Sequence, residues 1–268
     1  MTKRTPRYDG GKLAGRMAVD LQLDGKRALV LGASRGLGRA IAESLAAEGA
    51  AVITVARAPS GIAGARHIAA DLDDPAAPDA IIAAVGADER PLDILILNSG
   101  GPPTGTAADT SPDAFAAVMG RMFTAQLALV QAFLPAMRAQ GFGRIMAVAS
   151  SSVVAPIPGL VLSNTVRAAL ASWCKTLAGE VARDGVTVNL LLPGQIATDR
   201  LTSLHAARAA ASGMAAEDVM AAARAAVPAG RFGTPQEFAD MAAFLASPRA
   251  AYITGCAIRI DGGMTASL

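Results

Sequence analysis

A glycine-rich segment is the part of the sequence best suited to bind a ligand. Gly32, Gly36 and Gly38 directly follow the strand-like run Arg27–Leu31 and precede a segment of helical spacing. Glycines at such a junction let backbone amides approach a pyrophosphate, which the helix N-terminus also attracts. The spacing therefore predicts a dinucleotide phosphate site. A tight strand–helix turn without a ligand is the alternative, because three glycines alone are a weak signal.

Strand-like and helical segments alternate along the chain and would position this loop. We predict strands at 27–31, 51–55, 93–97, 144–148, 186–190 and 257–260, and helices at 39–49, around 81–85, at 111–138, 164–183, within 199–227 and at 235–245. Continuous apolar runs such as 93–97 are typical of parallel strands covered on both faces. The pattern predicts an α/β fold, a Rossmann-like three-layer sandwich with a doubly wound parallel sheet. We assign residues 1–20 to a flexible extension and 21–268 to one domain.

Composition excludes several classes of protein. Of the 268 residues, 52% are hydrophobic and 17% are charged, which excludes a disordered chain. The 24 basic and 22 acidic residues give a net charge of +2, too balanced for a nucleic-acid-binding protein. Two cysteines, Cys174 and Cys256, cannot form a disulfide framework, so we expect a cytoplasmic protein. We find no apolar stretch of membrane-spanning length, no secretory signal and no metal site, and we expect no membrane association.

Several short motifs together resemble the short-chain dehydrogenase/reductase superfamily over residues 25–265. They are the loop 32–38, Asp71-Leu72, Asn98-Ser99-Gly100-Gly101 in place of the family's usual Asn-Asn-Ala-Gly, the segment 193–198, and C-terminal signatures at 230–235, 252–255 and 261–263. The resemblance implies a nicotinamide cofactor. It places the following residues at the cofactor: Gly32, Ser34, Arg35, Gly36, Leu37, Gly38, Arg57, Asp71, Leu72, Asn98, Ser99, Gly100, Arg167, Pro193, Gly194, Ile196 and Thr198.

The end of the second predicted strand indicates which nicotinamide cofactor is preferred. An NAD enzyme of this design places a carboxylate there to bind the ribose hydroxyls, but this position is Ala56, followed by Arg57. The glycine loop adds Arg35. Arginine binds phosphate through paired hydrogen bonds, so two arginines without a carboxylate favour the 2′-phosphate. We predict NADP(H) over NAD(H); the alternative is that both arginines are solvated surface charges.

The catalytic positions depart from the family pattern. The resemblance implies a catalytic serine at Ser150, but Ser163 stands in the usual tyrosine position and Arg167 in the usual lysine position. Met122 falls in the position of the family's asparagine. A serine hydroxyl is far less acidic than a phenol, and arginine stays protonated and cannot relay a proton. We expect Ser150, Ser163 and Arg167 to form a donor cluster that stabilises an oxyanion, with Arg167 also holding the nicotinamide ribose.

Three functions are consistent with these residues. The first is an NADP(H)-dependent oxidoreductase that acts on a small carbonyl or alcohol substrate. The second is an enzyme of the same fold with non-redox chemistry, for which halohydrin dehalogenases are an analogy. The third is a cofactor-binding protein without turnover, which the altered tyrosine and lysine positions favour. NADPH binding separates the second from the others, and turnover that is sensitive to Ser150→Ala separates the first from the third.

Other candidates carry less weight. His205 could supply the missing proton, but a lone histidine in a polar stretch is more often a bystander. Cys174 is interpreted as a packing residue. Arg200, Arg208 and Arg224 could favour an anionic substrate, although a solvated helix face explains them more simply. The family resemblance also implies a homodimer or homotetramer assembled through the long helices beside the active site.

Overall fold

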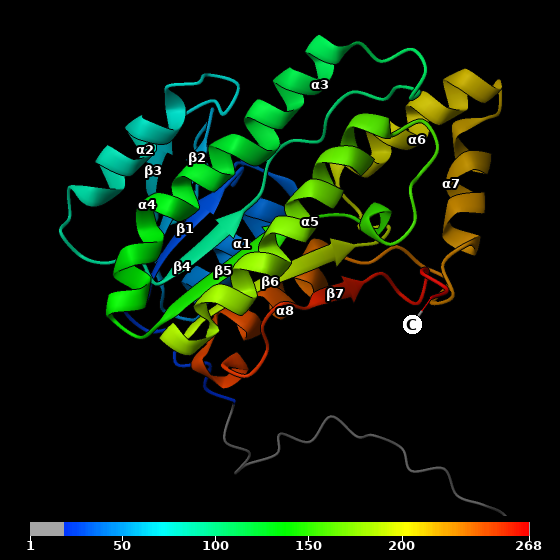
Figure 1. Ribbon diagram of the computed structural model, residues 1–268. Helices are drawn as coiled ribbons and strands as arrows, with labels where there is room; N and C mark the ends of the chain where they lie inside the picture. The colour runs from blue at the N-terminus through cyan, green and yellow to red at the C-terminus, as the bar shows by residue number, and fades with distance from the viewer. Residues whose placement is uncertain (1–18, 268) are drawn as a thin grey trace, which may run out of the picture.

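The computed structural model describes residues 19–267, and they form a seven-stranded parallel sheet with helices on both faces (Figure 1). The strand order is β3-β2-β1-β4-β5-β6-β7. The strands are β1 (Arg27–Leu31), β2 (Ala51–Ala56), β3 (Arg66–Ala69), β4 (Ile94–Leu97), β5 (Gly143–Val148), β6 (Val186–Pro193) and β7 (Ala257–Ile260). This confirms the predicted α/β, doubly wound architecture. Residues 1–18 of the predicted extension lie outside the described residues.

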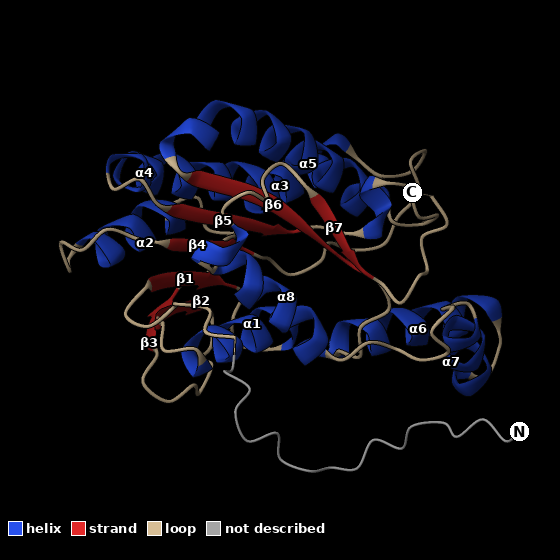
Figure 2. Ribbon diagram, turned by 90° about the horizontal axis from the view of Figure 1, so that it is seen from below, coloured by secondary structure: helices blue, strands red, loops and turns tan. Residues whose placement is uncertain are grey.

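Eight α-helices connect the strands, and they divide between the two faces of the sheet (Figure 2). They are α1 (Gly36–Ala47), α2 (Ala77–Gly86), α3 (Pro112–Met119), α4 (Ala125–Ala139), α5 (Val161–Val181), α6 (Asp199–Ser212), α7 (Ala216–Ala225) and α8 (Pro235–Ala246). Helices α2, α4 and α5 cover one face, and α1 and α8 cover the other. Helices α6 and α7 lie beyond the arrowheads of the strands, where they flank the site.

Successive side chains of each strand point to opposite faces of the sheet, so the hydrophobic core has one part on each face. In β1, Leu29 packs with the α2, α4 and α5 residues, whereas Val30 packs with those of α1 and α8. All five β1 side chains are buried, because both faces of a central parallel strand are covered. The rigid sheet therefore presents the carboxyl ends of β1, β4, β5 and β6 to the site at fixed positions.

Three elements differ from the sequence prediction. The helix predicted at 111–138 is two helices, α3 and α4, joined by a π-helical turn, η1 (Gly120–Thr124). The helical stretch at 199–227 breaks after α6, because Gly213 takes a left-handed conformation with φ of 69° that ends the helix. Strand β3 was not predicted, since this edge strand is only partly buried and carries no continuous apolar run.

The run from α3 through η1 to α4 also bears on the expected lack of a membrane segment. It is 28 residues long and is apolar enough, by length and composition alone, to cross a membrane. The expectation that no stretch reaches that length was therefore wrong by this criterion. A core helix of a soluble protein passes the same test, and this run carries Leu129 and Met137 of α4, which are fully buried against the sheet.

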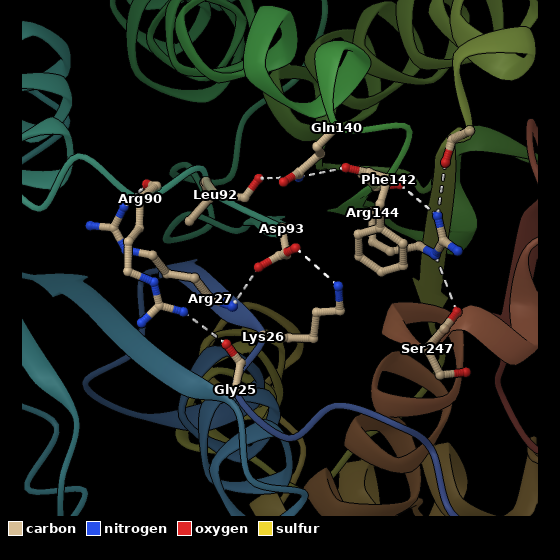
Figure 3. Close-up of polar contacts among 12 residues, drawn as sticks. Gly25, Lys26, Arg27, Arg90, Leu92, Asp93, Gln140, Phe142, Arg144 and Ser247 are labelled. Carbon is tan, nitrogen blue, oxygen red and sulfur yellow. Dashed lines mark hydrogen bonds and ion pairs between the residues drawn. The ribbon is translucent and has the colours of Figure 1, made fainter.

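A polar network joins the amino ends of the strands, opposite the site (Figure 3). The Asp93 carboxylate accepts from the backbone N–H of Arg27 at 2.8 Å and from Lys26 Nζ at 3.2 Å. The buried Arg144 lies over the Phe142 ring and donates to the carbonyl oxygen of Ser247 at 3.1 Å. Because buried charges are costly unless they are partnered, these contacts stabilise the buried Arg144 and Asp93 at the amino ends of the strands.

Candidate active site

The three glycines of the phosphate loop have different structural roles. A Cβ on Gly32 would lie 2.7 Å from Asn98 Nδ2, and a Cβ on Gly38 would lie 2.6 Å from the same atom and would also overlap the carbonyl oxygen of Gly32. These two glycines therefore permit close packing of the loop against the end of β4. Gly36, with φ of +59°, faces Thr198, whose Cγ2 lies 3.9 Å from the Cβ position. Because Gly36 has no side chain and no close neighbour, the space in front of the α1 N-terminus stays open to a ligand.

The N-terminus of α1 suits an anion. Among residues 19–267, no side chain caps this helix, its first turn carries no acidic residue, and Arg35 occupies the N-cap position in an extended conformation. By contrast, Thr234 and Glu237 form a complete capping box at α8. Uncapped amides at a helix N-terminus carry a partial positive charge and point outward. The loop and helix therefore fit a pyrophosphate, which would satisfy these amides.

The site lies where the strand order reverses. Strand β1 pairs with β2 on one side and β4 on the other, and ligands of open α/β sheets bind at this switch point. Asn98, directly after β4, donates from Nδ2 to the carbonyl oxygens of Leu31 at 3.2 Å and Gly32 at 3.3 Å. Ser99 is half-buried, and Gly100 has no atom within 4 Å of its Cβ position in the described structure. The Asn98 side chain therefore holds the glycine loop, and the two residues after it border open space.

At the predicted adenine end, one expected arginine, Arg57, lies beside the expected acid, Asp71. Arg57 follows β2, and its Nη1 lies 3.7 Å from Asp71 Oδ2; both side chains are exposed. Arg35 is also exposed. Leu72 packs against the core beside Asp71, and Ser34 is half-buried in the loop. An exposed ion pair of this length contributes little to stability, so the Arg57 guanidinium can turn toward another anion.

The segment after β6 covers the opposite side of the crevice. Pro193 ends β6, and Gly194 packs so closely on Asp261 that a Cβ would lie 2.6 Å from it. Ile196 is buried and bridges to Gly233. Thr198 caps α6 by accepting from the backbone N–H of Leu201 at 3.4 Å. The predicted nicotinamide segment is therefore anchored through packing and capping, with Thr198 facing Gly36 across the site.

The three predicted catalytic residues lie around the end of β5. Arg167, on α5, donates from Nε to Ser163 Oγ at 3.2 Å and from Nη1 to the carbonyl oxygen of Val148 at 2.5 Å. Ser150, two residues after β5, accepts from the N–H of Ser152 at 3.1 Å and begins a short 3-10 turn that packs on α5. The predicted contact between Ser163 and Arg167 is therefore present.

The pKa of Arg167 is lowered, although its guanidinium stays charged at neutral pH. Burial of its guanidinium, and then the positive charge of Arg200, lower the pKa of Arg167 to about 10. Arg200 lies at the start of α6 and donates from Nη2 to the carbonyl oxygen of Pro102 at 2.9 Å. Its guanidinium lies 3.0 Å from the Cβ position of Gly101. Arg200 is exposed, as the solvated helix face preferred from the sequence predicts, and its guanidinium also reaches the loop after β4.

Met122 lies in apolar surroundings, whereas His205 lies among aromatic and polar groups. Met122 lies in the π-helical turn and packs with Val118, Leu162 and Val166, so it offers no polar group to a proton relay. His205 stacks on Phe232, with ring centroids 5.9 Å apart, and its Nε2 lies 3.2 Å from Gln195 Oε1. Burial, and then Arg208, lower the pKa of His205 below its ordinary value. The imidazole borders a hollow of about 240 Å³ together with Thr198, Asp199 and Met220.

Cys174 behaves as the sequence predicts for a packing residue. Its side chain is buried in the core on the α5 side of the sheet. Burial raises the pKa of the Cys174 thiol to about 12, which removes the thiolate at neutral pH. Burial in the core and the raised thiol pKa both argue against a nucleophilic role for Cys174, because the thiolate is the reactive form.

Comparisons with known proteins agree with this geometry. A family model described as enoyl-(acyl carrier protein) reductase matches residues 32–265. The 3-oxoacyl-[acyl-carrier-protein] reductase FabG of Escherichia coli is 35% identical over 252 residues, covering 91% of this chain and 99% of the relative. The corresponding reductase MabA of Mycobacterium bovis is 31% identical over 239 residues, covering 88% of this chain and 91% of the relative.

Solved structures show the same likeness. L-sorbose reductase from Gluconobacter frateurii, in complex with NADPH and L-sorbose, has a TM-score of 0.85 at 31% identity, covering 93% of this chain and 100% of that one. YwfH, an NADPH-dependent reductase involved in bacilysin biosynthesis, has a TM-score of 0.86 at 28% identity, covering 91% and 100%. The sheet order, the glycine loop and these matches agree, and the chain belongs to the short-chain dehydrogenase/reductase superfamily.

Proposed function

We propose that this protein is an NADP(H)-dependent oxidoreductase that acts on a carbonyl or alcohol substrate. The observation that carries the proposal is the uncapped N-terminus of α1, with Gly36 open in front of it, at the switch point of the sheet. The named reductases among the relatives and the NADPH-bound neighbour support the same function. We propose that all the cofactor-binding residues predicted from the sequence, from Gly32 in the glycine loop to Thr198 after β6, contact the nicotinamide cofactor.

Preference for the phosphorylated cofactor rests on the adenine end of the site. Ala56, at the end of β2, offers no carboxylate to ribose hydroxyls. Arg35 and Arg57 are both exposed there, and Arg57 has only a long contact with Asp71. A 2′-phosphate would replace that contact with charge-assisted hydrogen bonds, which are shorter and stronger. We propose that Arg35 and Arg57 select NADP(H) over NAD(H).

Ser150, Ser163 and Arg167 are the proposed catalytic residues. The reduced nicotinamide, when bound, supplies the hydride. Ser163 Oγ accepts from Arg167 Nε, so the Ser163 hydroxyl proton is free to point at a substrate oxygen. A guanidinium bonded to Oγ stabilises negative charge there, which makes Ser163 a better proton donor than a free serine. Ser150 would donate a second hydrogen bond to the same oxygen and so stabilise the developing oxyanion.

A cofactor-binding protein without turnover is the second candidate. Arg167 Nη1 is engaged by the carbonyl oxygen of Val148, and Ser150 Oγ accepts from Ser152 N–H. These contacts give both residues a structural role in holding the end of β5 that does not require catalysis. The non-redox alternative is not favoured, because the glycine loop leaves the phosphate site open at Gly36.

Calorimetry on the purified apo protein tests the cofactor part of the proposal. We expect NADPH to bind at least tenfold more tightly than NADH, and Arg57→Ala to remove most of that difference while leaving NADH binding unchanged. Arg66→Ala is a matched control, because Arg66 is an exposed arginine on β3 with its own partner, Asp88. Equal binding of both cofactors to the wild type would contradict the preference, and binding of neither would contradict the function.

Turnover then separates the first candidate from the second. NADPH oxidation is followed with a panel of small ketones, and Ser150→Ala is compared with the wild type. A loss of about 10²-fold or more in Ser150→Ala, with NADPH binding retained, is expected for a group that stabilises an oxyanion. NADPH binding with no oxidation of NADPH by any panel member in the wild type would favour the protein without turnover.

The proposal also covers the domain organisation, the oligomeric state and the cellular location of the protein. We infer that residues 21–268 act as one domain, that the chain forms a homodimer or homotetramer through its long helices, and that it works in the cytoplasm. Helix α5, with 21 residues, and α4, with 15, supply long outer surfaces for such packing. Light scattering after size-exclusion chromatography should give two or four chains per particle, and a monomer at working concentration would contradict this.

A further inference from the structure

Helices α6 and α7 form a unit with few attachments to the rest of the fold. Within residues 19–267 the two helices pack on each other, and the contacts of either helix with any strand or other helix are slight. Both lie beyond the carboxyl ends of the strands (Figures 1 and 2). The individual side-chain contacts of α6 therefore determine how it sits beside the predicted nicotinamide segment, residues 193–198.

This segment pairs with the loop that precedes α8. The Gly233 N–H donates to the carbonyl oxygen of Gln195 at 2.9 Å, and the Ala197 N–H donates to the carbonyl oxygen of Gly233 at 2.8 Å. Ile196 and Gly233 thereby form a parallel β-bridge. The backbone conformation of the segment therefore depends on the loop that lies beside it.

His205 of α6 contacts both sides of this bridge. Its Nε2 lies 3.2 Å from Oε1 of Gln195, which belongs to the segment. Its ring stacks on Phe232, which belongs to the loop, with centroids 5.9 Å apart and 16° between the planes. An amide oxygen only accepts hydrogen bonds, so Nε2–H donates in the contact with Gln195. One buried imidazole thus joins α6 to the segment and to the loop.

Apolar packing is incomplete around this contact. His205 and Leu201 of α6, Met220 of α7 and the Phe232 ring line a hollow of about 240 Å³. Side chains that border a void lose dispersion contacts on that side. The guanidinium carbon of Arg224, on α7, lies 5.4 Å from the Phe232 centroid, which is close enough for a cation–π attraction. The directed contacts of His205 and Arg224 therefore matter more here than close packing does.

We propose that His205 is a positioning residue that holds segment 193–198 in the conformation that receives the nicotinamide ring. The inference rests on the proposed function and adds a residue to it. His205 acts through Gln195 and Phe232 rather than by touching the cofactor or the substrate. Its burial and its engaged Nε2 favour this role over the supply of a proton, which was the role considered from the sequence.

Two ligands that differ only in the nicotinamide test this role. 2′-Phospho-ADP-ribose is NADPH without its nicotinamide ring, so it reports on the adenine and phosphate parts of the site alone. Calorimetry measures the affinity of both ligands for the wild type, His205→Phe and Gln195→Leu. His205→Phe keeps an aromatic ring to stack on Phe232 and removes the N–H donor, whereas Gln195→Leu removes the acceptor.

His67→Phe is the matched control. His67 is the other histidine of the chain, and its Nδ1 also has a polar partner, Thr54 Oγ1, at 3.3 Å. It lies on the edge strand β3, whereas the nicotinamide segment follows β6 near the other edge of the sheet. The same substitution there removes a similar contact far from the segment.

We expect His205→Phe and Gln195→Leu to bind NADPH about fivefold to tenfold more weakly than the wild type, as the loss of one hydrogen bond allows. Both should bind 2′-phospho-ADP-ribose as the wild type does, which also shows that they are folded. The double variant should lose no more NADPH affinity than either single variant, because both changes remove the same contact. His67→Phe should leave the ratio of the two affinities unchanged.

A merely structural His205 would affect both ligands alike, so an unchanged affinity ratio in His205→Phe would overturn the inference. Additive losses in the double variant would also overturn it, because the two side chains would then act separately. So would equal affinity of the wild type for the two ligands, since the segment would then contribute nothing to nicotinamide binding. These results leave the proposed function intact, because NADPH still binds. A wild type that does not bind NADPH would contradict the proposed function and the inference together.

Discussion

Arg167 Nη1 donates a 2.5 Å hydrogen bond to the carbonyl oxygen of Val148, which ties helix α5 to the last residue of β5. The same side chain holds Ser163 Oγ at 3.2 Å. One guanidinium therefore sets the distance between the strand end that leads to Ser150 and the helix that carries Ser163. Its planar fork makes both contacts at once, which a lysine ammonium at the end of a flexible chain does less well.

Rebuilding the family's usual pair should increase the rate of carbonyl reduction. In the double variant Ser163→Tyr with Arg167→Lys, a phenol replaces the serine hydroxyl, which is a much weaker acid. The ammonium of the introduced lysine, one helical turn away, stabilises the phenolate. We expect kcat/KM for ketone reduction with NADPH to rise by about 10²–10⁴-fold, the usual contribution of a positioned acid. Arg167→Lys alone is the control and should not increase the rate. A double variant that is folded, binds NADPH and is no faster than the wild type would contradict the assignment of these positions.

Gly36→Ala should weaken cofactor binding far more than it weakens the fold. The added methyl group meets the described chain only at Thr198 Cγ2, 3.9 Å away, but enters the proposed phosphate site. Its φ of +59° costs about 1–2 kcal/mol of unfolding free energy. Calorimetry should show NADPH affinity reduced by about tenfold or more.

Gly64→Ala is the matched control for that variant. Gly64 also has a positive φ, +76°, and no described atom lies within 4 Å of its Cβ position. The two variants should lose similar unfolding free energy in urea, while only Gly36→Ala loses NADPH affinity. If both retain full affinity, the phosphate site is misplaced.

His205 should make the protein less stable in mild acid. Burial and Arg208 lower its pKa in the folded state below the ordinary 6.5, so between these two values the unfolded chain binds more protons. The contribution of His205 to stability is complete above about pH 6.5 and falls as the pH drops toward the folded-state pKa, by at most about 1.4 kcal/mol per pH unit. Urea unfolding of the wild type and His205→Gln from pH 7.5 to 5 measures it. The wild type should lose stability relative to His205→Gln as the pH falls below 6.5, and a difference that does not change with pH would refute the prediction.

The two cysteines should differ sharply in reactivity. Cys256 is exposed, whereas Cys174 is buried and its thiol pKa is raised to about 12. A thiol reagent at pH 8 should modify one cysteine per native chain rapidly and the second only after denaturation, because the thiolate is the reacting form. Cys256→Ser should remove the fast phase. Rapid modification of that variant under native conditions would show that Cys174 is accessible.

The sequence alone determined the layered α/β architecture, because strand-length apolar runs and helical spacing are local properties of the chain. Strands β1 and β7 begin and end where predicted, and the glycine loop lies between β1 and α1 as its residue types require. The break between α6 and α7 was missed because the sequence around it is rich in alanine, which is equally compatible with one continuous helix. The helix ends at Ser212 because Gly213 takes a left-handed conformation.

Only the tertiary structure decided what the polar side chains contact. Spacing placed Ser163 and Arg167 one helical turn apart, but it could not show that Arg167 reaches Val148 or that Arg200 reaches across Gly101 to Pro102. These contacts join residues up to 98 positions apart. They depend on how α5 and α6 pack against the ends of the strands, and that packing is set by the whole sheet, whose long-range arrangement no local pattern of residues records.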